Sequence, residues 1–172
     1  MEGQIMDGFA AVKSKFRHLM NAAIPGHHQL VIIGVDESDM AEFAFEWYGA
    51  NFHKPGNKVL LLHCPENYIN ATTMSPGRVV ELQREVEGKS CDLKRKFIDK
   101  ANKLGIEAEF KVEAAEKPGH AIVEVATKNE AAFIVTGTRG MGKIRRTILG
   151  SVSDFVVHHA PCPVLVCRHK EK

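Results

Sequence analysis

The chain has 172 residues, of which 44% are apolar, 26% charged and 7% aromatic, and its net charge is +2. This length and composition are typical of one globular domain with a sizeable core. The 23 basic and 21 acidic residues are too evenly balanced to favour a nucleic-acid or membrane partner. The sequence also lacks the run of about 18 apolar residues that a membrane-spanning helix needs.

The N-terminal region and the cysteines favour a cytoplasmic protein. Basic residues at positions 13, 15 and 17 interrupt the apolar block near the N-terminus, which makes it a poor secretory signal. The four cysteines show no metal-type spacing, and two of them lie in apolar runs, as packed thiols of a reducing compartment do. Oxidative pairing of Cys162 with Cys167 is the alternative, although packing alone explains Cys167.

Residues 1–28 are expected to form an extension ahead of the main domain, which we place at residues 29–170. Apolar side chains recur in the extension at helical spacing and predict an extra amphipathic helix; they are Phe9, Val12, Phe16, Leu19 and Met20. We expect this helix to dock on the surface of the domain. The alternative is a helix that binds a partner or a membrane surface.

The first part of the domain contains two buried strands with a helix between them. Residues 30–35 form a nearly continuous β-branched run, and residues 59–64 form a second apolar run, both typical of strands covered on two faces. Ser38 or Asp39 is expected to cap the intervening helix. The polar residues 65–75 are expected to form a loop.

A long helix is predicted to begin at Ser75 and Pro76, because a serine side chain accepts hydrogen bonds from unpaired amides and proline presets the backbone. Its core-facing stripe has steps of three and four residues and comprises Val79, Leu82, Val86, Ser90, Leu93, Phe97, Ala101 and Leu104. Gly105 is expected to end the helix as a C-terminal cap.

Three further strands complete the pattern. Residues 106–112 alternate in polarity and predict an exposed strand near an edge, whereas residues 131–136 and 164–167 are apolar. Pro118 opens the helix between the first two of these strands, and Ser151 is expected to cap the helix before the last. The alternation predicts an α/β fold: a five-stranded parallel open sheet, doubly wound and Rossmann-like, with helices on both faces.

Two of the predicted strand ends carry unusual chemistry. Open α/β sheets bind ligands beyond the carboxyl ends of their strands. The first strand ends in Gly34, Val35 and Asp36, and the fourth runs through Thr136 into a glycine-rich segment that enters a helix at Ser151. We therefore expect a ligand between these two segments.

The segment 137–151 has the features of a phosphate site. Gly137 and Gly140 lack a β-carbon, so their backbone can take positive φ and approach a ligand closely. Unpaired amides at the helix start after Gly150 attract anions. The hydroxyls of Ser151 and Ser153 are further donors to phosphate oxygens, and the segment also carries the basic residues Arg139, Lys143, Arg145 and Arg146.

Other ligand-binding patterns fit the sequence poorly. It contains no G-x-x-x-x-G-K-[ST], which excludes a P-loop protein. Its glycines at positions 137, 140 and 142 follow the fourth strand in the order G-x-x-G-x-G, whereas dinucleotide-binding glycines follow the first strand. The histidine pairs at 27–28 and 158–159 make a poor metal site, because adjacent side chains on a helix point apart.

The chain resembles the ATP-binding branch of the universal stress protein family. The family pattern is Gly, two residues, Gly, nine residues, then Gly followed by Ser or Thr, and it is met here by Gly137, Gly140, Gly150 and Ser151. The Val-Asp pair at positions 35 and 36, with Ser at 38, resembles the end of the family's first strand, and residues 161–166 resemble its closing strand. The resemblance spans about residues 29–168.

This resemblance implies a set of contacts with ATP, with or without Mg²⁺. Gly34, Val35 and Asp36 would contact the adenosine, and backbone atoms of Cys64 would line the adenine pocket. Thr136 and Gly137 would lie on the ribose side. The phosphates would be held by Arg139, Gly140, Gly150, Ser151, Val152 and Ser153.

Family members commonly pair through the last strand, which implies a homodimer through Val164, Leu165, Val166 and Cys167. An apolar edge strand also favours pairing on physical grounds. Departures from the family are modest: Cys64 stands where an aliphatic residue is commoner, and Thr138 where serine is frequent. For Asp36, simple capping of the next helix is the alternative, and we interpret His63 as a packed histidine rather than a catalyst.

Three functions remain to be separated. The first is a nucleotide-dependent sensor or switch in a stress response with at most slow ATP hydrolysis, because the segment 137–151 contains no Glu or His as a general base. The second is a Mg²⁺-dependent nucleotide hydrolase or adenylyl-handling enzyme, and the third is an interaction protein with an empty pocket. We expect the first.

Overall fold

The computed structural model describes residues 29–65, 74–138 and 149–168. Its elements are, in chain order, β1 (Leu30–Gly34), α2 (Asp39–Asn51), β2 (Lys58–His63), α3 (Pro76–Leu104), β3 (Ala108–Val112), α4 (Pro118–Lys128), β4 (Phe133–Gly137), α5 (Ser151–His159) and β5 (Val164–Cys167). All the predicted strands and helices of the domain are confirmed, with small shifts in their bounds. The predicted extra helix within residues 1–28 lies outside the described residues.

The five strands form one parallel sheet in the order β3-β2-β1-β4-β5. The doubly wound open sheet is therefore confirmed, and so is the edge position of β3. The first strand, β1, lies in the middle of the sheet. The chain adds β2 and β3 on one side of it and then returns to add β4 and β5 on the other side. The carboxyl ends of β1 and β4 thus form the switch point at which such sheets bind ligands.

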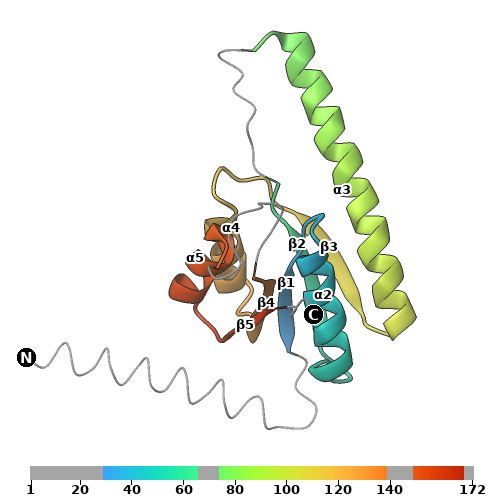
Figure 1. The fold of residues 1–172 in the computed structure, drawn as a ribbon, viewed down its shortest axis with the longest axis vertical. Helices are drawn as coiled ribbons and strands as arrows, with labels where there is room; N and C mark the ends of the chain where they lie inside the picture. The colour runs from blue at the N-terminus through green and yellow to red at the C-terminus, as the bar shows by residue number, and fades with distance from the viewer. Residues whose placement is uncertain (1–28, 66–73, 139–148, 169–172) are drawn as a thin grey trace, which may run out of the picture.

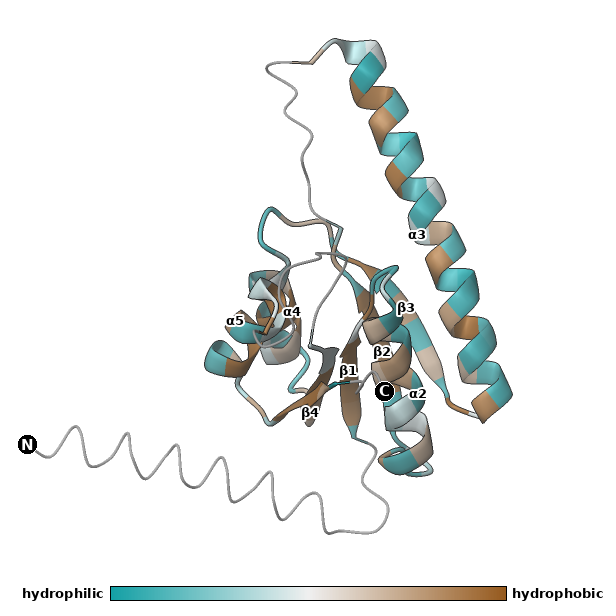
Figure 2. Cartoon of the chain, viewed as in Figure 1, coloured by the Kyte–Doolittle hydropathy of each residue, from teal (hydrophilic) through white to brown (hydrophobic). Residues whose placement is uncertain are grey.

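Helices cover both faces of the sheet, α2 and α3 on one and α4 and α5 on the other (Figure 1). Successive strand residues feed two separate cores, because side chains alternate between faces. Val31 and Ile33 pack towards α2 and α3, whereas Ile32 packs towards α4 and α5. In Figure 2 the inner strands β1 and β4 carry the apolar colour, and teal is most extensive on α3.

Helix α3 begins at Pro76 and ends at Gly105, which takes the left-handed conformation with φ 66°, as predicted. The Ser75 side chain makes no capping hydrogen bond, contrary to expectation, and the Ser75 carbonyl instead accepts the Val79 N–H at 3.1 Å. The stripe is buried only in its second half, at Ser90, Leu93, Phe97 and Ala101, since the first half of α3 extends past the sheet (Figure 1). Leu104 stays 50% exposed. No helix among the described residues has the length and apolar character to cross a membrane.

Helix α5 starts one residue earlier than its predicted cap implies. Gly150 is the N-cap residue, with extended backbone at φ −66° and ψ 154°, and its carbonyl accepts the Asp154 N–H at 2.8 Å. Ser151 already belongs to the first helical turn, so the prediction that Ser151 caps α5 is wrong. This places the Ser151 side chain and its amide together at the mouth of the helix.

Gly137, the last residue of β4, is required by packing rather than by an unusual backbone conformation. The positive-φ glycines of the described chain are Gly56 and Gly105, so Gly137 does not use the positive φ that glycine permits. A β-carbon at Gly137 would lie 2.8 Å from the carbonyl oxygen of Met40 and 2.9 Å from its carbonyl carbon. The first turn of α2 therefore passes directly over the end of β4.

We expect Gly137→Ala to lower the free energy of unfolding by roughly 1–3 kcal/mol, because the added methyl group meets backbone atoms that cannot turn away. Gly88→Ala is the matched control. Gly88 lies inside α3 with open space around its would-be β-carbon, and this change should stabilise the protein by about 1 kcal/mol. Urea unfolding of both variants measures the difference, and equal midpoints would contradict the packing argument.

Candidate functional site

The carboxyl ends of three neighbouring strands meet at one edge of the sheet. When the strand registers are continued past the end of β1, Asp36 lies level with Cys64 beyond β2 and with Thr138 beyond β4. The backbone ladder already extends one step in this direction, since the Val35 N–H donates to the Leu62 carbonyl at 3.0 Å. The residues predicted to contact the nucleoside therefore lie on adjacent strand ends.

Asp36 holds the residue that caps the next helix. Its Oδ1 accepts the Ser38 N–H at 2.9 Å and also the Ser38 hydroxyl. Ser38 Oγ in turn accepts the Ala41 N–H at 3.2 Å and is the N-cap of α2. Capping is thus performed by Ser38, with Asp36 one step behind it, and both hydrogen bonds of the carboxylate use Oδ1.

The Thr138 carbonyl ties the end of β4 to the start of α5. It accepts the Gly150 N–H at 2.8 Å and lies 3.0 Å from Ser153 Oγ, which is also 3.0 Å from the Gly150 carbonyl. Ser153 is 2% exposed. Its hydroxyl is therefore engaged within the protein, and the backbone amide is the group of Ser153 that fits an external anion.

The first turn of α5 presents amides before its own hydrogen bonding begins. The first helical bond is donated by Asp154 to Gly150. The amides of Ser151, Val152 and Ser153 precede it, and the first N–H groups of a helix have no acceptor one turn earlier in the chain. Together with the helix dipole, they make a positive end that suits phosphate.

The β2 end contributes Cys64, which is half-buried, and the neighbouring His63. Burial, with a smaller contribution from the Glu113 carboxylate, raises the pKa of the Cys64 thiol to about 12. His63 Nδ1 lies 3.0 Å from the Val35 carbonyl oxygen, and the ring lies 6.3 Å from that of Phe110. His63 is packed, as interpreted from sequence, but no sequence pattern indicates its bond to Val35.

Of the remaining predicted residues, some belong to the described part of the site and others to residues 139–148, which lie outside the described residues. Thr136 is buried, and its Oγ1 donates to the Gly137 carbonyl at 3.2 Å. Gly34 lies beside Thr136 across the β1–β4 seam, where a β-carbon would stand 4.0 Å from Thr136 Oγ1. Arg139 and Gly140 lie outside the described residues. The same holds for the basic residues between positions 143 and 146.

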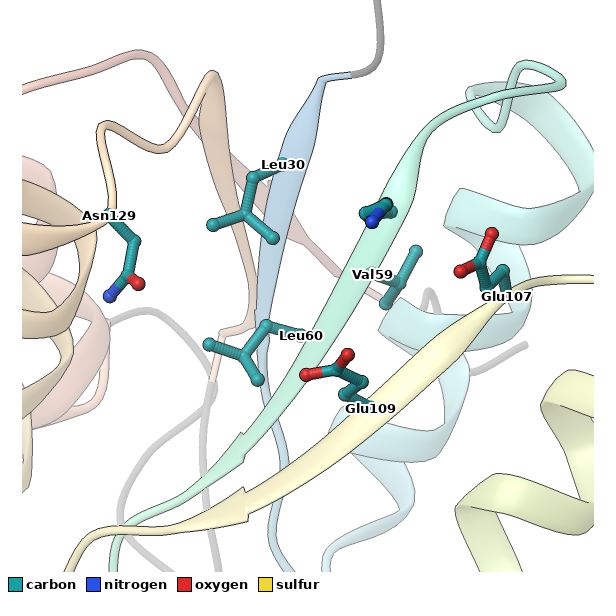
Figure 3. A pocket seen from close by; sticks show the side chains of 7 residues that line it. Leu30, Val59, Leu60, Glu107, Glu109 and Asn129 are labelled. Carbon is teal, nitrogen blue, oxygen red and sulfur yellow. The ribbon is translucent and has the colours of Figure 1, made fainter.

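A shallow hollow of about 110 Å³ lies at the opposite end of the sheet (Figure 3). Leu30 and Lys58, which line it, are the first residues of β1 and β2, and Asn129 lies just past α4. Leu60 and Glu109 also line the hollow. Because parallel sheets bind ligands at the carboxyl ends of their strands, this hollow is separate from the candidate site.

Within residues 29–65, 74–138 and 149–168, His, Cys, Asp and Glu side chains nowhere gather in threes to hold a metal ion. His158 and His159 each bond through Nδ1 to a backbone carbonyl one turn earlier, of Asp154 and Phe155. The His159 and His120 rings both stack on the Phe155 ring, with centroid distances of 3.9 Å and 4.0 Å respectively. These histidines therefore have packing roles.

Known proteins share both the sequence pattern and the fold. A model of the universal stress protein family matches residues 28–168. A relative from Staphylococcus saprophyticus, named as a universal stress protein, is 31% identical over 147 residues, which cover 84% of this chain and 86% of that protein. The universal stress protein UspA of Lactobacillus plantarum superposes with a TM-score of 0.71 and 22% identity, over 83% of this chain and 99% of that one. A universal stress protein of Arabidopsis thaliana with AMP bound has a TM-score of 0.63 and 24% identity, over 83% and 92% of the two chains.

We expect Cys64 to react slowly with iodoacetamide and exposed Cys91 to react quickly. At pH 8.5 a thiol with a pKa of about 12 is ionised in roughly one molecule in three thousand, and only the thiolate attacks. Labelling of Cys64 should therefore rise about tenfold per pH unit between pH 8 and 10. Peptide mass spectrometry measures both rates, Cys91→Ser checks the assignment, and equal rates at pH 8.5 would contradict the expected burial.

Proposed function

The chain belongs to the universal stress protein family, and from this premise we propose that it is a cytoplasmic, ATP-binding sensor or switch in a stress response. The nucleotide would lie across the carboxyl ends of β1 and β4. The observation that supports this most directly is the start of α5, which the Gly150 N–H and the Ser153 hydroxyl hold against the Thr138 carbonyl at the carboxyl end of β4. The AMP bound to the Arabidopsis relative supports the same ligand class.

The base and ribose would be held on the β1 side. Asp36 Oδ1 is occupied by Ser38, so Oδ2 is the oxygen suited to accept a hydrogen bond from the base or from a ribose hydroxyl. Gly34 and Val35 would contact the adenosine, and backbone atoms of Cys64 would line the base. Thr136 and Gly137 would lie beside the ribose.

The phosphates would be held on the α5 side. The amides of Ser151, Val152 and Ser153 and the exposed Ser151 hydroxyl are donors at the positive end of a helix, and Gly150 brings the backbone close. Arg139 and Gly140 would complete the phosphate site, and Mg²⁺ would enter with the phosphates of ATP. Rapid hydrolysis would need a general base beside the phosphates. The Asp36 carboxylate is bonded to Ser38 on the β1 side of the switch point, away from the proposed phosphate site, so sensing is favoured.

We also propose that two copies pair through β5. This strand is an edge of the sheet, and Val164, Leu165 and Val166 are only half-buried in the single chain, while Cys167 is buried. The carbonyls of Pro163 and Cys167 accept amides of β4 at 3.0 Å, so by the alternation of a parallel ladder the peptide groups of Val164 and Val166 face outward. A second copy would satisfy them.

We expect Gly140→Val and Ser151→Val each to weaken ATP binding about tenfold or more, because the first fills space next to the phosphates and the second removes a charge-assisted donor. Thr127→Val is a matched control, since Thr127 lies in the last turn of α4 and its hydroxyl donates to the carbonyl of Val123. Titration calorimetry with ATP and Mg²⁺ measures the affinities. Two site variants that bind like the parent would overturn the site, and steady release of phosphate by the parent would favour a hydrolase.

We expect Val166→Pro to convert the dimer into a monomer, because proline removes an outward N–H while the ladder to β4 uses the neighbouring residues. Val166→Ala keeps that N–H and should stay dimeric. Size-exclusion chromatography with light scattering measures the mass, and thermal unfolding shows that both variants fold. A dimeric Val166→Pro variant, or a monomeric parent, would contradict pairing through β5.

A further inference from the structure

The hydrogen-bond ladder between β1 and β2 stops one rung short at the candidate site. In a parallel pair, a residue that donates its N–H to one residue of the neighbouring strand accepts at its carbonyl from the residue two positions further along that strand. Val35 donates to Leu62 at 3.0 Å. The next rung would therefore run from the Cys64 N–H to the Val35 carbonyl.

The side chain of His63 takes that carbonyl instead. His63 Nδ1 lies 3.0 Å from the Val35 oxygen. A carbonyl oxygen can only accept, so Nδ1 carries the proton and donates, and Nε2 is the basic nitrogen of the neutral ring. The imidazole thus supplies the donor that the Cys64 backbone would have supplied if β2 had continued.

Contacts on the other side of β2 fix the imidazole in this position. The His63 carbonyl accepts the Glu113 N–H at 2.9 Å, which anchors the His63 backbone to the chain after β3. The His63 ring packs 6.3 Å from the Phe110 ring, tilted by 36°. His63 is half-buried, so its hydrogen bond to Val35 is partly shielded from water.

We propose that His63 is a positioning residue of the nucleotide site: by closing the ladder on the Val35 carbonyl, its Nδ1–H releases the Cys64 amide to face the ligand. This inference rests on the proposed function. The released N–H lies level with Asp36, where it can donate to an acceptor nitrogen on the edge of a purine base. The same bond fixes the Val35 carbonyl, directly before the Asp36 carboxylate. His63 therefore positions the Cys64 amide and the Asp36 carboxylate, which meet the nucleoside, but His63 itself contacts neither the base nor the phosphate.

Two neutral amide variants separate this role from general packing. The amide nitrogen of asparagine reaches the place of the histidine Nδ1, whereas that of glutamine reaches the place of Nε2. We expect His63→Gln to weaken AMP binding about tenfold, the size of one lost hydrogen bond, and His63→Asn to bind within about threefold of the parent. Titration calorimetry with AMP measures both, and urea unfolding of the nucleotide-free variants reports any change in stability.

The outcomes are distinct. Weak binding by His63→Gln with rescue by His63→Asn, at similar unfolding midpoints, supports the positioning role. If His63→Gln binds as well as the parent, or His63→Asn loses as much affinity as His63→Gln, the role of His63 is overturned while nucleotide binding stands. If the parent itself binds neither AMP nor ATP, the proposed function fails and this inference fails with it.

A second measurement needs no nucleotide. In the free parent protein, the Cys64 amide should exchange with solvent at least about tenfold faster than the Val35 amide, which is bonded within the ladder. Nitrogen NMR of the imidazole should show the proton on Nδ1. A protected Cys64 amide, or a proton on Nε2 of the neutral ring, would mean that the backbone closes the rung itself, and the proposal would be wrong.

Discussion

The site depends on the fate of peptide groups where a parallel ladder runs out. Inside the sheet β1 pairs with both β2 and β4, and past Gly34 the Val35 N–H still donates to the Leu62 carbonyl of β2. A buried peptide group left without a partner costs free energy comparable to a lost hydrogen bond. Each group at this edge must therefore find a side chain, a helix or a ligand, and those choices decide which groups are left for a ligand.

The two sides of the switch point solve this problem differently. On the β1 side, side chains complete the bonding: His63 closes on the Val35 carbonyl, and Asp36 holds Ser38. On the β4 side the Thr138 carbonyl takes a backbone amide from Gly150 and the hydroxyl of Ser153. The first arrangement fixes groups that suit a base and ribose. The second fixes the start of α5 beside the carboxyl end of β4.

The sequence predicted the frame of this site better than its details. Hydrophobic runs and helix signals such as Pro76 and Gly105 placed the strands and helices to within one or two residues, because burial and backbone conformation act locally. The roles of Gly137 and Ser153 depend on tertiary contacts, with the first turn of α2 and with the Thr138 carbonyl, and these cannot be seen in a one-dimensional pattern. For the same reason, the bond between His63 and Val35, 28 positions apart, had no sequence signal.

Thr138 also connects the phosphate side to the free edge of the sheet. Its carbonyl holds the start of α5, and its N–H donates to the carbonyl of Cys167 on β5 at 3.0 Å. A ligand that shifts the first turn of α5 therefore also acts on Thr138, which is bonded directly to the edge strand β5. Coupling between sites needs such an element with contacts to both. With the proposed nucleotide at the switch point and the proposed second copy at β5, both would act on Thr138, one through its carbonyl and the other through its N–H.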